Sequence, residues 1–76
     1  MTLFKLIGTT NDAIRPYEGK YCMITQNRAT KQLRIDIFNS AVSITTSPCV
    51  DKMELGNLVV GRTENSAYFF EKVCEM

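Results

Sequence analysis

The chain has 76 residues, of which 45% are hydrophobic and 22% are charged, and its net charge is +1. This composition excludes the class of disordered chains, which combine low hydrophobicity with high net charge. A chain of this length is expected to form one domain, residues 1–76, that buries only about 60% of the surface its unfolded form exposes.

Six strands are predicted, because β-branched and aromatic residues alternate with polar residues over short runs that turn residues separate. The runs cover residues 2–7, 20–26, 32–38, 41–46, 58–63 and 67–73. One helical turn is predicted over residues 11–15, with Thr10 or Asn11 as its N-cap and Pro16 at its end. The expected fold is therefore all-β and mainly antiparallel, with at most one short helical turn.

The amino-terminal segment does not have the pattern of a leader or a membrane anchor. Lys5 interrupts its apolar residues, and Gly8 and Thr9 end the run before it reaches the length of a signal sequence. No segment approaches the roughly 20 apolar residues that a membrane span requires. We therefore expect a cytoplasmic protein that has no membrane partner.

Three cysteines and the absence of histidine bear on redox state and metal binding. Cys22, Cys49 and Cys74 are odd in number and none forms a CxxC pair, so we expect reduced thiols buried as structural residues. A zinc site is not expected without histidine or paired cysteines, and no other metal or cofactor is implied.

The clearest pattern is a hairpin over residues 32–46, in which Asn39 and Ser40 are predicted to form a two-residue loop. This loop would pair Ile37 with Val42, Ile35 with Ile44 and Leu33 with Thr46 on one face. The opposite face would then pair Phe38 with Ala41, Asp36 with Ser43 and Arg34 with Thr45. A slip of one residue would expose the apolar face, so burial specifies the register.

A second hairpin is predicted around Glu64 and Asn65, with a three-residue loop as an alternative because Glu64 does not favour positive φ. Val60 would face Phe69, Val59 would face Phe70, and Gly61 would lie under Tyr68. Both faces of this hairpin are apolar, so either both faces are covered or one of them is an interface. Residues 47–56 between the hairpins contain Pro48 and are predicted to form a crossing segment or a short edge strand.

Six short strands, two tight hairpins and one long early connection at residues 8–19 indicate a small barrel or β-roll, because closure hides strand edges. The order of a first strand, a long loop and a meander resembles that of SH3-like barrels over residues 2–46. The chain has no tryptophan, which peptide-binding SH3 domains use to hold proline-rich helices. The resemblance therefore concerns architecture and carries no binding motif.

The sequence does not indicate an enzyme. Histidine, the commonest general base, is absent, and Asp51 and Glu54 lie in a segment that resembles a solvated turn. A glycine-rich phosphate loop is also absent, because Gly56 and Gly61 are not followed by a helical pattern.

Two surfaces are candidates for binding. Exposed aromatic and methionine side chains are typical of protein interfaces, and the residues predicted to line such a surface are Tyr17, Tyr21, Met23, Phe38, Tyr68 and Phe70. A covering layer formed by residues 8–19 is the competing interpretation. The alternative is a basic surface, formed by Arg28, Lys31 and Arg34, that follows the phosphates of a nucleic acid. The near-neutral net charge of the chain does not favour this interpretation.

These observations support three functional hypotheses. The first is a non-catalytic protein-binding module, comparable to the small inhibitors that phages and mobile elements encode, which act by occupying a partner's surface. The second is a small β-barrel that binds nucleic acid through Arg28, Lys31 and Arg34. The third is a self-associating structural subunit, such as a homodimer, that pairs through an exposed strand or the last hairpin.

Overall fold

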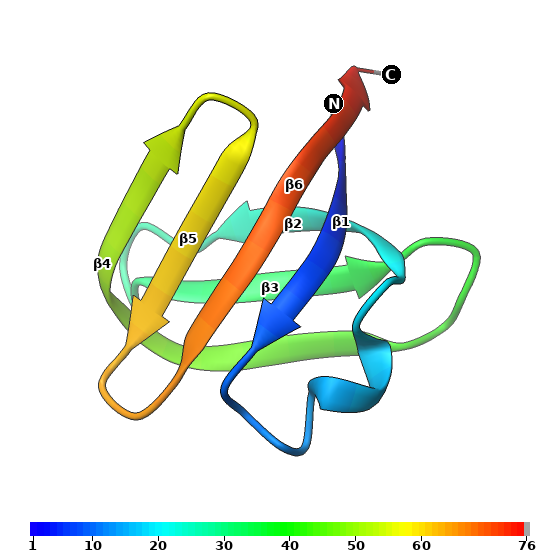
Figure 1. Cartoon of the computed structure of the whole chain (residues 1–76). Coiled ribbons are helices and arrows are strands. Elements are labelled where there is room, and N and C mark those ends of the chain that lie inside the picture. Colours follow the sequence, from blue (N-terminus) through cyan, green and yellow to red (C-terminus); the bar gives the residue numbers. More distant parts are fainter. Residues whose placement is uncertain (76) are drawn as a thin grey trace.

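The computed structural model describes residues 1–75 and contains six antiparallel strands that follow one another around a closed barrel (Figure 1). The all-β expectation is confirmed. The strands are β1 (Thr2–Thr9), β2 (Tyr21–Gln26), β3 (Gln32–Ile37), β4 (Ser43–Leu55), β5 (Leu58–Thr63) and β6 (Ala67–Glu75). Pairing of β6 with β1 closes the ring, so the first and last strands lie side by side.

The core is built from alternate residues of the strands, as expected for a sheet with one buried face. Phe70, at the centre of β6, is fully buried and meets Phe4 of β1 edge to face, with ring centroids 6.3 Å apart. The buried cluster comprises Leu6, Cys22, Ile35, Ile37, Val59, Tyr68 and Phe70.

The register of the β3–β4 hairpin is confirmed, because Ile35 pairs with Ile44, Asp36 with Ser43 and Arg34 with Thr45. The predicted two-residue loop is wrong. The Ile37 amide donates to the Val42 carbonyl and the chain turns through residues 38–41, with Asn39 at a φ of 58°. Asparagine tolerates this left-handed conformation, so the wider turn forms without strain.

Strand β4 is much longer than predicted, because residues 47–55 continue it and do not form a separate crossing segment. The alternative prediction, an edge strand, agrees with the second half of β4, which pairs only with β5. Its first half pairs with β3 as far as Pro48, and its second half pairs with β5 from Cys49 onward. Pro48 lies where β4 exchanges one partner for the other, beside irregularities in both ladders. A missing amide proton is tolerated at such a bulge.

The β5–β6 hairpin forms in the predicted register, with Val59 opposite Phe70, Val60 opposite Phe69 and Gly61 opposite Tyr68. The Thr63 amide donates to the Ser66 carbonyl, which closes a loop of Glu64 and Asn65. The face that carries Val59 and Phe70 is in the core. The other face, with Leu58, Val60 and Phe69, is half-buried on the outside of the barrel.

The connection between β1 and β2 contains a 3-10 helix, η1 (Arg15–Tyr17), and not only the predicted turn over residues 11–15. Pro16 was expected to end the turn but lies in the first turn of η1, where its missing amide proton breaks no hydrogen bond. Asn11 does begin the segment, because its side-chain oxygen accepts from the Ala13 amide at 3.0 Å.

Candidate protein-binding surface

The structure separates the six predicted contact residues into three groups. Tyr68 and Phe70 are buried, with exposed fractions of 3% and 0%, so the prediction that they lie on a contact surface is wrong. Both side chains lie on the side of β6 that faces the core, opposite Gly61 and Val59, where large side chains are needed to fill the interior. The Tyr68 hydroxyl lies 3.1 Å from the side-chain nitrogen of Asn11, which donates to it.

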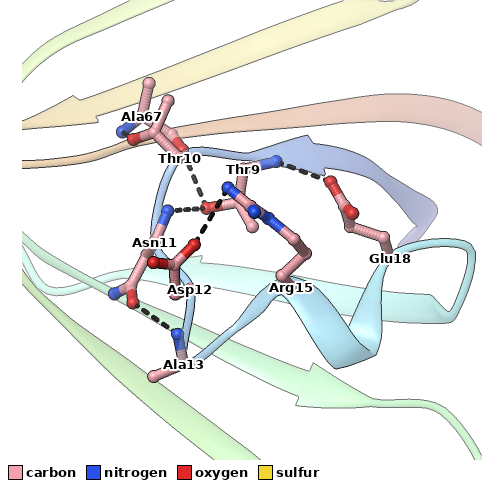
Figure 2. A network of polar contacts seen from close by, with 8 residues as sticks. All are labelled: Thr9, Thr10, Asn11, Asp12, Ala13, Arg15, Glu18 and Ala67. Atoms are coloured by element: carbon pink, nitrogen blue, oxygen red, sulfur yellow. Dashed lines mark hydrogen bonds and ion pairs between the residues drawn. The ribbon is translucent and has the colours of Figure 1, made fainter.

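Tyr17 is half-buried and packs with Ile14 against the core cluster, as the covering-layer interpretation predicts. A network of polar contacts holds this segment in place (Figure 2). The carboxylate of Glu18 accepts from the Thr9 amide at 3.0 Å, and the Thr9 hydroxyl donates to the Ala67 carbonyl at 2.9 Å. Because the network ties the segment to both β1 and β6, Tyr17 belongs to the folded body of the protein.

Tyr21 and Phe38 remain on the surface and lie next to each other. The Phe38 amide donates to the Tyr21 carbonyl at 2.9 Å, which continues the β2–β3 ladder beyond the pair of Cys22 and Ile37. Their exposed fractions are 46% and 40%. The ammonium of Lys5 lies 6.0 Å from the centre of the Tyr21 ring, so a cation borders the aromatic pair.

Met23 is half-buried and connects this aromatic pair to a hollow of about 360 Å³. The hollow lies beyond Phe4 and Cys22, the last ladder pair of β1 and β2 toward the start of β1. In the other direction the pairing continues, because the Leu6 amide donates to the Lys20 carbonyl. Its lining consists of Met1, Thr2, Phe4, Met23, Ile24, Thr25 and Asp36. We call Tyr21, Met23, Phe38 and this hollow the aromatic surface.

A second exposed apolar feature was not identified from the sequence. Met53 pairs with Val60, and Val60 pairs with Phe69, so these three side chains form one row across the outside of β4, β5 and β6. Met53, at the free end of this row, is 47% exposed. The apolar outer face of the last hairpin is a usable signal, but the sequence leaves the Met53 segment as a crossing or an edge strand and does not say that β5 is its partner.

The three basic residues are all exposed, and one of them is engaged by an acidic partner. Arg34 points outward from β3, and its guanidinium Nε lies 3.1 Å from both the Asp36 carboxylate and the Ser43 hydroxyl. Arg28 and Lys31 are exposed in the preceding turn, where the side-chain oxygen of Asn27 accepts from the Ala29 and Thr30 amides. An acidic partner thus offsets one of the three charges.

The three cysteines are free, but they occupy different environments. Cys22 is fully buried, and this burial raises the pKa of its thiol to about 11. Cys49 is half-buried, and burial also raises the pKa of its thiol. Cys74 is exposed near the end of β6, so the expectation that all three are buried structural residues is wrong for this one.

Within residues 1–75, no three or more side chains of the metal-binding types cluster to form a metal site. The same residues include no helix with the length and apolar character needed to cross a membrane. Comparison with protein families, with curated proteins and with solved structures found no match to this chain. The SH3-like resemblance therefore stays a prediction about architecture.

Proposed function

We propose that this chain is a non-catalytic protein-binding module whose contact site is the aromatic surface. The observation that carries the proposal is the placement of two large aromatic side chains, Tyr21 and Phe38, side by side on the outside of the barrel. Tyrosine and other aromatic residues are enriched at the energetic centres of protein interfaces. A small inhibitor that occupies a partner's surface would use a site of this kind.

The hollow beside Met23 adds a place for an anchor from the partner. Its lining includes Phe4 and Ile24, whose side chains also pack against the barrel core. A partner side chain that enters this hollow would exchange water for apolar contact on several sides, which is how central interface anchors gain affinity. Lys5 and Asp36 border the site with opposite charges and would orient an approaching partner.

Affinity capture with matched variants tests the proposal. Nuclease-treated lysate of the source organism is passed over the parent protein, the double variant Tyr21→Ser with Phe38→Ser, and Val73→Ser. Val73 is also an exposed apolar residue, 44% exposed, but lies on β6 outside the aromatic surface. The parent and Val73→Ser should capture the same protein, and the double variant should lose it.

Two results would contradict the proposal. One is the absence of any captured protein that survives nuclease treatment, and the other is equal capture by the double variant. Circular dichroism of each variant establishes that a loss of capture does not come from unfolding. Because Tyr21 and Phe38 are exposed, their replacement by serine should leave the spectrum unchanged.

A further inference from the structure

The second half of β4 is a sheet edge without a partner strand. After Cys49, whose amide donates to the Lys31 carbonyl, β4 makes ladder contacts only with β5. Among residues 1–75, no strand pairs with the opposite side of residues 50–55, and Figure 1 shows β4 at the outside of the β4–β5 hairpin. Backbone groups on such an edge are available to another strand.

The regular part of this edge, residues 51–55, has neither a proline nor a bulge. Natural edges carry prolines, bulges or charged side chains, especially lysine, which hinder pairing with another chain. Here Pro48 precedes the edge, the bulge falls at Val50, and the charged residues of the edge are Asp51, Lys52 and Glu54. Val50 and Leu55 are each 61% exposed, so apolar side chains stand at both of its ends.

The charges on this edge are self-complementary, and the Glu54 carboxylate also lies 3.4 Å from the Lys72 ammonium of its own chain. In an antiparallel ladder, only alternate residues direct their backbone groups to a given side, so two copies can pair only where the two residue numbers have an even sum. Within residues 50–55, sums of 104 and 106 each keep five residues of each copy in contact, and a sum of 108 keeps three. A sum of 104 places Lys52 opposite Lys52 of the second copy, and a sum of 108 places Glu54 opposite Glu54. A sum of 106 opposes Lys52 to Glu54 twice.

The register with opposite charges also aligns the apolar row. It places Met53 opposite Met53 of the second copy, so the row of Met53, Val60 and Phe69 continues across the junction into the same row of the copy. Cross-strand pairs of opposite charge and of apolar side chains both stabilise a sheet, whereas like charges directly opposite destabilise it. Charge and apolar contact therefore select the same register.

We propose that two copies of this chain form a symmetric dimer by antiparallel pairing of residues 50–55 about an axis at Met53. The interface is isologous, as in most homodimers. It lies away from Tyr21 and Phe38 and does not depend on the proposed function. Each side contributes one short strand segment, which is small for an interface, so dissociation into monomers should be measurable at micromolar concentrations.

Charge reversal tests both the dimer and its register. Lys52→Glu and Glu54→Lys should each raise the dissociation constant, measured by sedimentation velocity, at least about tenfold because two attractive pairs become repulsive. The two variants should associate when mixed. The double variant Lys52→Glu with Glu54→Lys should dimerise more tightly than either single variant, because the exchanged charges restore both pairs across the junction, although the ion pair of Glu54 with Lys72 is lost. Lys20→Glu, at an exposed position just before β2, is the control and should dimerise normally.

A parent protein that remains monomeric at millimolar concentration would overturn the proposal, as would a single reversal that leaves dimerisation unchanged. A direct probe of the register covers the case in which a charge variant unfolds. In a Cys74→Ser background, Met53→Cys should form a reducible cross-linked dimer on mild oxidation, and the background alone should not. Failure of Met53→Cys to cross-link while the protein sediments as a dimer would overturn the pairing along β4.

Discussion

Gly61 allows two strands that are not hydrogen-bonded to each other to approach closely. A Cβ atom at this position would lie 2.9 Å from the Leu33 side chain of β3 and 3.6 Å from the Cys49 sulfur. The first distance is shorter than the optimal van der Waals separation of two carbon atoms. The sequence predicted the pairing of Gly61 with Tyr68, but not this contact with Leu33, because it depends on how the barrel closes.

Cys22 should make the stability of the protein fall at alkaline pH. Its thiol has a pKa of about 11 in the folded protein and 9.0 as the reference value for an unperturbed thiol. The folded state therefore holds its proton more tightly, so this contribution is complete below pH 9 and is lost as the pH rises through 11. The full loss is about 3 kcal/mol, and about half of this loss should have occurred at pH 10.

Urea unfolding under reducing conditions at pH 7.5 and pH 10 measures this effect, with Cys22→Ala as the comparison. The variant is less stable at pH 7.5 because it leaves a cavity. Its deficit relative to the parent should shrink by about 1 kcal/mol at pH 10, because alanine has no proton to lose. Cys74→Ala removes an exposed thiol and serves as the control. A deficit for Cys22→Ala that does not change with pH would contradict the argument.

At the scale of the element, local pattern predicted the hairpins but not the course of β4. Ile35 and Ile44 alternate with polar residues on both sides of a turn, so burial alone selects their register. Residues 47–55 do not alternate in this way, because the edge they form is mostly exposed. Their extended course is set by β5, which is a partner that local sequence does not reveal.

The same distinction explains the outcome for the candidate site. The exposure of Tyr21 and Phe38 could be predicted from the alternation of side chains along a strand, because their neighbours Cys22 and Ile37 point into the core. Tyr68 and Phe70 lie in a hairpin whose two faces are both apolar, so parity does not say which face is inside. The contact of Gly61 with Leu33 and the burial of Thr63 place their face in the core, and both depend on the assembled barrel.

The β3–β4 hairpin gives a graded stability prediction. Ile35 is fully buried, so Ile35→Ala should lower the free energy of unfolding by about 2–5 kcal/mol through lost burial and a cavity. Ile44 lies opposite it but is only half-buried, so Ile44→Ala should cost roughly half as much. Thr45→Ala, at an exposed position of the same strand, is the control. Urea unfolding in which Ile44→Ala costs more than Ile35→Ala would contradict the observed packing.

At the scale of the whole molecule, pairing of distant strands mixes the charges of the two halves of the chain. Residues 1–34 carry six basic and two acidic residues, for a net charge of +4, and residues 35–76 carry three basic and six acidic, for −3. Strand pairing places Lys5 opposite Glu71, and Arg34 of the basic half bonds to Asp36 of the acidic half. The sequence asymmetry therefore does not become a basic face.

This mixing limits how strongly the protein can bind a nucleic acid. Arg28 and Lys31 are exposed in one turn, whereas the guanidinium of Arg34 is held by Asp36 and Ser43. Two phosphate contacts to a single strand correspond to a slope of about −1.4 in a plot of log affinity against log salt concentration. We therefore expect weak binding to single-stranded DNA or RNA at most, with a slope no steeper than this value.

Fluorescence anisotropy with labelled oligonucleotides over a range of salt concentrations tests this expectation. Arg28→Ala with Lys31→Ala should remove any salt-dependent binding, and Arg34→Ala alone should leave it unchanged, because Asp36 already engages that guanidinium. Replacement of all three residues should then act no more strongly than replacement of the first two. A steeper slope, or a loss of affinity in Arg34→Ala, would show that Arg34 exchanges Asp36 for phosphate and that the outer face of β3 binds the strand. That result would favour a nucleic-acid-binding barrel over the protein-binding module, because Arg34 and the Tyr21–Phe38 pair lie on the same outer face of β2 and β3, where aromatic rings stack on bases.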